Sequence, residues 1–248
     1  MISSSPDSLL QPPIYLRGIR YIQIPTTLLA QVDSAHGGKT GINFQGFKNQ
    51  IGSFNTPLVT VVDISLLKSL SRDQIIDGLG EIIKAGLTKD PKILSILQKE
   101  TFLSITNSPR LLELIKRSIK VKLSYTNKDY KDTKDRQLLN AGHTIGHAIE
   151  LKYGISHGTA VLIGLVQELI FTESLGLSDP LVCRYLNNLL STLDVSLNGK
   201  MKAEWSSVLH DKKIAEEAIV FPIIQKVRVS KLHKIDLKLL KRFVGKLV

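Results

Sequence analysis

From about residue 69 onward, the chain is a series of segments in which apolar residues recur every three or four positions. In "SRDQIIDGLGEIIKAGL", Ser71 precedes apolar residues at positions 75, 76, 79, 82 and 83, which is the spacing of one face of a helix. Each further segment of this kind begins near a polar cap or a proline and also predicts a helix. These segments are "DPKILSILQKE", "SPRLLELIKRSIKVKLSYTN", "DRQLLNAGHTIGHAIELKYG" and "HGTAVLIGLVQELIFTESLG". The sequence therefore predicts a helical domain over residues 69–248.

Two stretches near the end of this domain have a different pattern. "EEAIVFPIIQKVRVS" is compatible with a short strand pair, and "DLKLLKRFVGKLV" predicts a basic amphipathic helix. We interpret the basic face of that helix as solvated, with its apolar face docked on the domain. A helix that lies on a membrane surface or binds a partner is the alternative.

The first 68 residues combine strands and loops. "RYIQIP" (20–25) predicts a short strand, and "TTLLAQVDS" after it has helical spacing behind a threonine cap. The glycine-rich stretch 36–57 predicts a loop. "LVTVVD" (58–63) is a continuous β-branched run, which is typical of a buried parallel strand. The expected fold class is therefore α-rich α/β.

Composition excludes some classes of protein. Cys183 is the single cysteine, so no intramolecular disulfide can form, which fits a cytoplasmic protein. No apolar run approaches 18 residues, and the first residues lack the basic and apolar regions of a secretory signal, so we expect no membrane span or export. The net charge of +11 is either a solvated basic surface or a field that draws an anionic ligand. Aromatic residues make up only 6% and no nucleic-acid module occurs, so nucleic acid is the weaker candidate.

A histidine pair in "NAGHTIGHAIE" raises the question of a metal site. His143 and His147 are four residues apart, so on a helix they share one face with Cβ atoms about 5–6 Å apart. The zincin motif requires glutamate directly after the first histidine, and Thr144 stands there, which excludes it. The alternative to a metal site is two histidines with ordinary hydrogen bonds.

A catalytic zinc would need three protein ligands. His157 starts the helix after a short turn, so it can fold back toward the pair. Glu81 lies within an apolar helix, where a carboxylate is costly to bury unless it is paired or bound to metal. The candidate ligands are therefore Glu81, His157 and one of His143 and His147.

Glycine and basic residues suggest a place for an anion. "HGGKT" resembles a Walker A loop, but the position five residues before Gly38 is Asp33, so a P-loop is not predicted. Glycines beside Lys39 still let backbone N–H groups approach an anion, although an ordinary flexible loop is the alternative. Several further cations, each a surface charge if taken alone, would make a phosphate and carboxylate pocket if they converge. They are Lys84, Lys122, Arg136, Lys212 and Lys213.

From Tyr15 to about Lys213, the sequence resembles the 3-dehydroquinate synthase family of the sugar-phosphate cyclase superfamily. The motifs that carry the resemblance occur in the family's order: "YLRGIRYIQIPTTLLAQVDSAHGGKTGIN", "KNQIGSF", "GLGEIIKAGL", "LLNAGHTIGHAIE" and "HGTAVLIGL". The resemblance implies a shikimate-pathway lyase of aromatic amino acid biosynthesis. Such an enzyme converts 3-deoxy-D-arabino-heptulosonate 7-phosphate to 3-dehydroquinate and phosphate, with transient oxidation by NAD and a divalent metal, zinc or cobalt.

The resemblance also implies roles for residues. It places Glu81, His143 and His157 on the metal, and His147 near the substrate in proton transfer. Lys84, Arg136 and Asn140 match further catalytic positions. The matched substrate-binding positions are Arg17, Lys39, Asn49, Lys122, Lys212 and Lys213, and the positions near the cofactor are Thr26, Thr27, Asp33 and Lys48. Arg17 matches an arginine that reaches a neighbouring subunit, which implies a homodimer.

The sequence departs from the family pattern in one large respect. Family members have a glycine-rich pyrophosphate loop in an upstream α/β half, and the nearest pattern here, "GLGEII" (78–83), lies within a predicted helix. We therefore expect a remnant of a nucleotide-binding α/β domain over 1–68, followed by an all-helical metal- and substrate-binding domain over 69–248. We interpret the chain as a fragment of a longer enzyme. The alternatives are a shortened gene product with little activity, or a second chain that supplies the missing half.

Smaller departures remove none of the proposed metal ligands. Thr159, Gln74 and Lys134 stand where the family usually has an acidic residue, a glutamate and a glycine. Competing hypotheses remain a catalytically silent remnant that binds metal or a phosphorylated ligand, a sister sugar-phosphate cyclase and, more distantly, a basic nucleic-acid binder.

Overall fold

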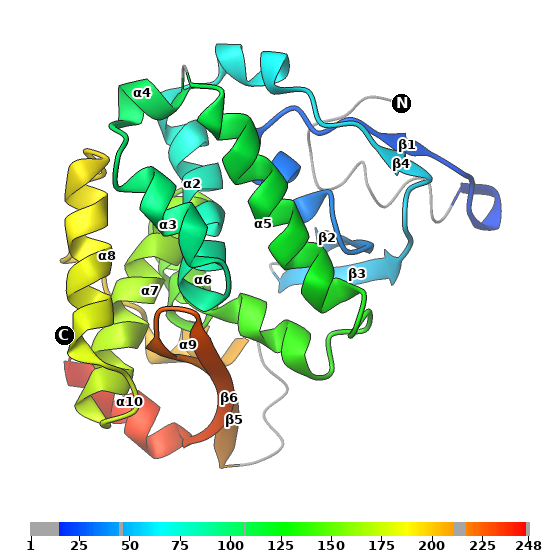
Figure 1. The fold of residues 1–248 in the computed structure, drawn as a ribbon. Coiled ribbons are helices and arrows are strands. Elements are labelled where there is room, and N and C mark those ends of the chain that lie inside the picture. Colours follow the sequence, from blue (N-terminus) through cyan, green and yellow to red (C-terminus); the bar gives the residue numbers. More distant parts are fainter. Residues whose placement is uncertain (1–14, 45–46, 107, 211–216, 247–248) are drawn as a thin grey trace.

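The computed structural model describes residues 15–44, 47–106, 108–210 and 217–246. Within these ranges the chain is mostly helical, with short strands near both ends (Figure 1). The α-helices are α2 (Arg72–Thr88), α3 (Pro91–Leu97), α4 (Phe102–Thr106), α5 (Arg110–Thr126), α6 (His143–Tyr153), α7 (His157–Ser174), α8 (Pro180–Thr192), α9 (Trp205–His210) and α10 (Leu237–Lys246). The strands are β1 (Ile22–Gln23), β2 (Lys39–Phe44), β3 (Phe47–Phe54), β4 (Val59–Thr60), β5 (Ala218–Lys226) and β6 (Val229–Asp236). Shorter helical turns are η2 (Tyr15–Arg17), the π-helical η3 (Ala30–Ser34), η4 (Ile64–Ser69) and η5 (Asp135–Asn140).

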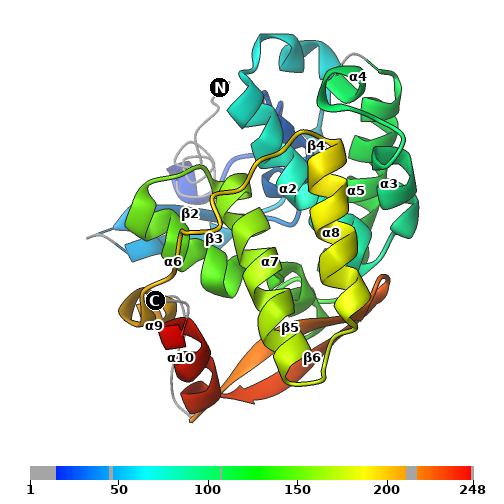
Figure 2. The same cartoon turned by 90° about the vertical axis from the view of Figure 1, so that its left-hand side faces the viewer.

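Two buried helices, α2 and α7, form the centre of the helical body. Helix α2 packs against α3, α5 and α7, and α7 lies between α6 and α8 (Figure 2). Fully buried side chains such as Leu79, Ile82 and Leu162 join these helices into one apolar core. A second core, built around Phe171 and Phe221, lies where α7 meets the β5–β6 hairpin and α10. Burial of these apolar surfaces is the main favourable term that holds the helices together.

The boundaries of α2 and α3 follow the caps that the sequence predicts, and α8, which was not predicted, is capped in the same way. Ser71 and Gln74 form a reciprocal capping box at the start of α2. Asp90 and Asp179 accept hydrogen bonds at the starts of α3 and α8, and both helices begin with proline. The predicted helices that correspond to α2, α3, α5 and α7 are confirmed, and so is the amphipathic helix α10.

One predicted helix is interrupted. The segment "DRQLLNAGHTIGHAIELKYG" forms η5 and then α6, with a break at Ala141 and Gly142. Gly142 has a φ of 79°, and a Cβ there would lie 2.7 Å from the carbonyl oxygen of Val161. The prediction of a single continuous helix was therefore wrong, because close packing against α7 requires a left-handed glycine at this point.

The prediction of a loop over 36–57 was also wrong. Strands β2 and β3 form an antiparallel hairpin in which Thr40 faces Ser53 and Gly41 faces Gly52. A Cβ on Gly52 would lie 2.2 Å from the carbonyl oxygen of Thr40, so the glycine allows the two strands to approach. Glycine that indicated a loop in the sequence thus serves strand pairing in the fold.

The short strand β4 is parallel, as predicted, and pairs with β1, but it is not buried. Only Ile22 with Val59 and Gln23 with Thr60 are in register. Leu58 and Val59 are 59% and 52% exposed, so the prediction of a buried strand over 58–63 was wrong. A parallel sheet is ordinarily covered on both faces, and within the described ranges this one consists of two strands alone.

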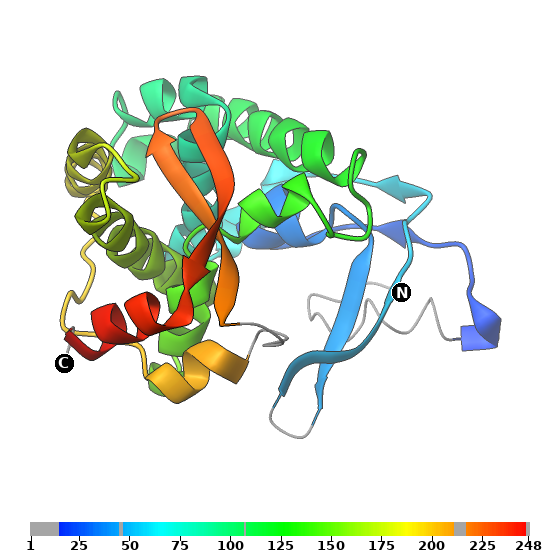
Figure 3. The same ribbon diagram turned by 90° about the horizontal axis from the view of Figure 1, so that it is seen from below.

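The predicted helical domain contains the β5–β6 hairpin, so it is not all helical. The hairpin pairs Ala218 with Asp236 and continues to Lys226 opposite Val229. Seen from below, it lies apart from the β2–β3 hairpin and leads directly into α10 (Figure 3). The strand pair that "EEAIVFPIIQKVRVS" allowed is therefore present, and its inward side chains complete the second core. Across the described ranges, no helix combines the length and apolarity needed to cross a bilayer.

Candidate active site

Three helices bring a carboxylate and two imidazoles together. Glu81 lies in the middle of α2, His143 is the first residue of α6, and His157 is the first residue of α7. The Oε1 atom of Glu81 lies 3.5 Å from Nε2 of His143 and 3.5 Å from Nε2 of His157. Residues that are 62 and 76 positions from Glu81 in sequence therefore converge on one oxygen atom.

Close helix packing explains this convergence. A Cβ on Gly80 would lie 2.8 Å from the carbonyl oxygen of Gly158, and one on Gly158 would lie 2.2 Å from that of Asp77. These two glycines allow α2 and α7 to approach backbone to backbone beside Glu81 and His157. A larger residue at either position would separate the helices that carry Glu81 and His157.

Glu81 is held charged in the interior. Its side chain is 3% exposed, and Oε2 forms an ion pair with Nζ of Lys84, which is also 3% exposed. Burial raises the pKa of Glu81, but the charges of Lys84 and His157 outweigh it, so the pKa is lowered overall. The Oε1 atom is buried and has no hydrogen-bond partner among the described residues.

Each histidine is oriented through its other ring nitrogen. Nδ1 of His143 donates to the carbonyl oxygen of Ala141 at 3.1 Å, which leaves Nε2 free of hydrogen toward Glu81. Nδ1 of His157 lies 3.2 Å from Oε2 of Glu150, so a carboxylate orients this ring. A metal-binding histidine typically has such a partner on its second nitrogen.

The two histidines have opposite pKa shifts. Burial lowers the pKa of His143, and the nearby Lys84, His147 and His157 lower it further. Burial also lowers the pKa of His157, but the nearby carboxylates of Glu150 and Glu81 raise it to about 9. The raised value reflects the negative charge gathered around His157, which would also attract a divalent cation.

His147 is a third imidazole at the same place. Its ring centroid lies 4.9 Å from that of His143 and 5.7 Å from that of His157. One ligand atom from each of the three histidines lies within 4.8 Å of the others. The described site thus offers four nitrogen and oxygen ligands, the donor set that zinc and cobalt prefer. The residues fit a divalent metal because the buried, unpartnered Oε1 of Glu81 points between two Nε2 atoms.

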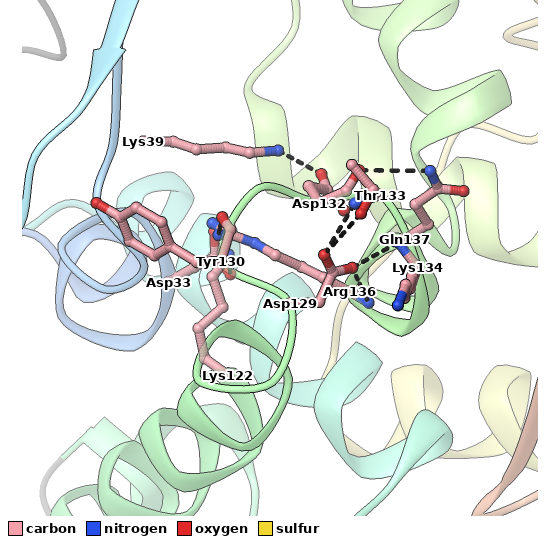
Figure 4. A network of polar contacts seen from close by, with 10 residues as sticks. All are labelled: Asp33, Lys39, Lys122, Asp129, Tyr130, Asp132, Thr133, Lys134, Arg136 and Gln137. Carbon is pink, nitrogen blue, oxygen red and sulfur yellow. Dashed lines mark hydrogen bonds and ion pairs between the residues drawn. The ribbon is translucent and has the colours of Figure 1, made fainter.

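The predicted cations Lys39, Lys122 and Arg136 each contact an acceptor of the protein. Nζ of Lys122 lies 2.7 Å from Oδ1 of Asp33, and Lys39 forms an ion pair with Asp132 (Figure 4). Burial raises the pKa of Asp33, but the charge of Lys122 outweighs it and the pKa is lowered. The first contact joins α5 to η3, and the second joins the β2–β3 hairpin to the loop between α5 and η5.

Arg136 is buried where that loop meets the glycines of residues 36–38. Its Nη1 donates to the carbonyl oxygen of Tyr130 at 2.6 Å, and the residue is 4% exposed. A Cβ on Gly37 would lie 2.7 Å from Nη2 of Arg136, and the φ of Gly37 is 107°. Glycine is therefore required at this position for both its backbone conformation and the space that it leaves for the guanidinium.

The other predicted site residues divide into three groups. Thr26 and Thr27 follow the carboxyl end of β1, where Thr27 Oγ1 accepts a hydrogen bond from the Ala30 N–H at 3.2 Å, and Asn140 ends η5. Arg17 is exposed and has a φ of 65°. The backbones of Lys48 and Asn49 lie in β3, but their side chains are outside the description, and Lys212 and Lys213 lie outside the described residues.

Sequence reasoning missed the acceptors around these cations. Asp132 and Tyr130 contact Lys39 and Arg136, and Glu150 contacts His157. Each lies in a polar stretch where charged residues are common, so nothing in the local pattern distinguished it. Their position seven or fewer residues from a predicted site residue was the only available signal.

Family models match most of the chain. Residues 10–77 match the model of the 3-dehydroquinate synthase N-terminal domain, and residues 78–214 match the model of the C-terminal domain. The chain belongs to the 3-dehydroquinate synthase family. The resemblance that the sequence motifs predicted is therefore confirmed.

Curated members of this family are similar over most of the chain. The 3-dehydroquinate synthase of Corynebacterium diphtheriae is 42% identical over 218 residues, which covers 86% of this chain and 61% of the relative. That of Thermodesulfovibrio yellowstonii is 38% identical over 228 residues, covering 89% and 64%. The chain thus spans less than two thirds of the length of these 3-dehydroquinate synthases.

Solved structures of related cyclases have the same fold. A 2-deoxy-scyllo-inosose synthase in complex with carbaglucose-6-phosphate, NAD+ and Co2+ is 25% identical, with a TM-score of 0.81 over 96% of this chain and 70% of its own. A 2-epi-5-epi-valiolone synthase from Streptomyces hygroscopicus, with NAD+ and Zn2+ bound, is 22% identical, with a TM-score of 0.85 over 97% and 69%. The α-rich α/β fold class is therefore confirmed for this member of the 3-dehydroquinate synthase family.

Proposed function

We propose that this chain carries the metal- and substrate-binding machinery of 3-dehydroquinate synthase. The reaction is a lyase reaction that converts 3-deoxy-D-arabino-heptulosonate 7-phosphate to 3-dehydroquinate and phosphate. The observation that carries the proposal is the convergence of Glu81, His143 and His157 at 3.5 Å, with the buried Lys84 paired to the same carboxylate. Its membership of the 3-dehydroquinate synthase family supports the choice of substrate over that of a sister cyclase.

Glu81, His143 and His157 would hold a divalent metal, zinc or cobalt. When bound, such a cation supplies Lewis-acid polarisation of substrate oxygens. Lys84 holds the Glu81 carboxylate charged, and Glu150 and the carbonyl of Ala141 orient the two imidazoles toward it. The metal found with related cyclases, Co2+ in one and Zn2+ in another, agrees with this donor set.

His147 is the proposed proton-transfer group. Its ring packs edge-on to that of His143, one helical turn away on the same face of α6. An imidazole nitrogen beside the metal ligands can take a proton from a substrate carbon or hydroxyl and return it later. Asn140 ends the preceding turn, where its side-chain amide would hydrogen-bond substrate hydroxyls.

Lys39, Lys122 and Arg136 would bind the carboxylate and phosphate of the substrate. Lys39 and Lys122 already contact carboxylates of Asp132 and Asp33, so a substrate anion would compete with these partners. Arg136 contacts a neutral carbonyl instead, which leaves its charge available to an anion. Asn49, Lys212, Lys213 and Arg17 would complete this set, with Arg17 reaching the site of a second subunit in a homodimer.

Thr26, Thr27, Asp33 and Lys48 would lie against the nicotinamide end of NAD. NAD supplies the acceptor and donor of hydride. Thr26 and Thr27 follow the carboxyl end of β1 in its parallel pairing with β4, which is where open α/β sheets bind nucleotides. The sequence contains no glycine-rich pyrophosphate loop, so the chain by itself would hold NAD weakly.

Phosphate release tests the proposal. We expect metal-loaded protein to release inorganic phosphate from 3-deoxy-D-arabino-heptulosonate 7-phosphate in saturating NAD. Arg136→Met should lower kcat/KM by about 10²-fold or more, because it removes a buried cation at the substrate anion. Arg184→Met, an exposed arginine on α8, is the matched control and should match wild type.

A catalytically silent binding protein is the second candidate, and the pairing of Lys39 with Asp132 and of Lys122 with Asp33, which occupies cations assigned to the substrate, favours it. It predicts that Co2+ and the phosphorylated substrate still bind, as measured by calorimetry, while phosphate release stays at the uncatalysed rate. Absence of both binding and release would contradict both functions.

A further inference from the structure

Two contacts outside the ligand set, one buried and one partly buried, lie at the starts of the two histidine helices. Among the described residues, neither Gly142 nor Ser156 caps its own helix with a side chain. The first N–H groups of a helix have no partner within the helix, so a buried start requires acceptors from elsewhere. At both helices, carboxylates from a neighbouring helix supply them.

Glu168 of α7 caps α6. Its Oε2 accepts a hydrogen bond from the Gly142 N–H at 2.7 Å, and its Oε1 accepts one from the Ile145 N–H at 3.1 Å. These two amides flank His143 in the first turn, and Glu168 is 4% exposed. The single carboxylate therefore fixes the backbone on both sides of a predicted metal ligand.

Asp77 of α2 caps α7 in the same way. Its Oδ1 accepts a hydrogen bond from the Gly158 N–H at 2.8 Å, directly after His157. Asp77 lies one turn before Glu81 on α2, so it connects the helix of one ligand to that of another. Glu150 of α6 contacts His157, so a third carboxylate links α6 to the start of α7.

We propose that Glu168 and Asp77 are positioning residues that fix His143 and His157 at the metal site and raise its affinity for a divalent cation. The inference rests on the proposed metal site. Each helix start carries a partial positive charge, and two of them converge where a cation would bind. The two carboxylates offset that charge and also hold the first turn of each helix in place.

Glycines beside these caps allow α6 and α7 to pack closely. A Cβ on Gly142 would lie 2.6 Å from Cγ of Leu165, and one on Gly164 would lie 2.0 Å from the carbonyl oxygen of Gly142. Because α6 and α7 approach this closely, a glutamate on α7 can reach two amides of α6. The caps therefore belong to the same tight packing that brings the ligands together.

The test is the affinity of the purified, chelator-treated protein for Co2+, measured by calorimetry together with the visible absorption of the bound ion. Glu168→Gln and Asp77→Asn keep side-chain size but remove the charge and one acceptor. We expect each to raise the dissociation constant by about 10-fold or more, as losses behind metal ligands typically do, and to change the absorption of bound Co2+. Glu173→Gln on α7 and Asp73→Asn on α2 make the same charge changes away from these contacts and should bind as wild type does.

The outcomes separate the inference from the proposed function. Wild type that binds Co2+ while folded Glu168→Gln and Asp77→Asn bind it equally well overturns the positioning role and leaves the metal site intact. Wild type that binds no Co2+ overturns both. Should Glu168→Gln fail to fold, as judged by circular dichroism without metal, Asp77→Asn decides alone, because Asp77 is only half-buried and its carboxylate accepts from the Gly158 amide.

Discussion

Glu81 and Lys84 form an ion pair that is almost completely buried, with each side chain 3% exposed. Two charges taken from water require excellent mutual geometry and further partners. The second oxygen of Glu81 faces Nε2 atoms of His143 and His157 instead of a hydrogen-bond donor of its own. The free energy of folding and the proposed metal affinity would therefore both depend on this one carboxylate.

Removal of Lys84 should expose that linkage. We expect Lys84→Met to lower the free energy of unfolding of the metal-free protein by about 3 kcal/mol or more, because it leaves a buried carboxylate without its cation. Urea unfolding in a chelator measures the change. Lys92→Met, at an exposed position of α3, should stay within about 0.5 kcal/mol. A loss below about 1 kcal/mol for Lys84→Met would contradict the claim that Lys84 stabilises the buried carboxylate of Glu81.

Asp129 organises the loop that leads to Arg136. Its carboxylate accepts hydrogen bonds from the backbone N–H groups of Thr133 at 2.9 Å, Lys134 at 2.6 Å and Arg136 at 3.2 Å. Burial raises the pKa of Asp129, but these hydrogen bonds outweigh it and lower the pKa below its usual 3.8. Because the folded-state pKa is the lower one, the stabilisation is present above pH 3.8 and is lost as pH falls through the folded-state value.

This sign gives a pH-dependent prediction. In Asp129→Asn, an amide NH2 group replaces the carboxylate oxygen that accepts hydrogen bonds from the Lys134 and Arg136 N–H groups, and it cannot accept them. The variant should therefore unfold at a lower temperature than wild type at pH 6. The difference in melting temperature should shrink as pH falls below about 4, because protonation weakens the same contacts in wild type. Thermal unfolding from pH 6 to pH 3 measures it. A difference that stays constant or widens in acid would contradict this role for Asp129.

At the scale of elements, caps and periodicity predicted most helices, and tertiary packing decided the rest. The start of α2 was readable because Ser71 and Gln74 make a local capping box. The start of α6 was not, because its cap is Glu168 on another helix. The β2–β3 hairpin was missed since its glycines, including Gly41 and Gly52, serve close strand pairing that no local pattern reveals.

The approach of α2 and α7 gives a prediction at this scale. Gly158→Ala would place a Cβ 2.2 Å from the carbonyl oxygen of Asp77, and backbone cannot rotate away as a side chain can. We expect a loss of about 1–3 kcal/mol in the free energy of unfolding, measured by urea denaturation. At Gly199 nothing lies within 4 Å of an added Cβ, so Gly199→Ala should be close to neutral. Equal effects of the two substitutions would contradict the claim that Gly158 is needed for the close approach of α2 and α7.

At the scale of the whole molecule, the sequence indicated the ligands but not how they meet. Glu81 could be identified as unusual because a carboxylate stood in an apolar helical stripe, and family motifs selected His143 and His157. Their convergence depends on the packing of α2, α6 and α7, which brings together residues far apart in the chain. The exposed faces of β1 and β4 were equally unpredictable, since β-branched runs usually indicate burial. The division of the chain at residues 68 and 69 stays a prediction.

The most direct measurement is the metal content of the purified protein. Elemental analysis after incubation with Co2+ or Zn2+ and removal of free ion should give close to one equivalent for wild type and for His147→Ala, and little for Glu81→Ala or His157→Ala. This result follows if one carboxylate and two imidazoles hold the ion while His147 serves the substrate. Unchanged metal content in folded Glu81→Ala would contradict the central claim that these three helices close around one cation.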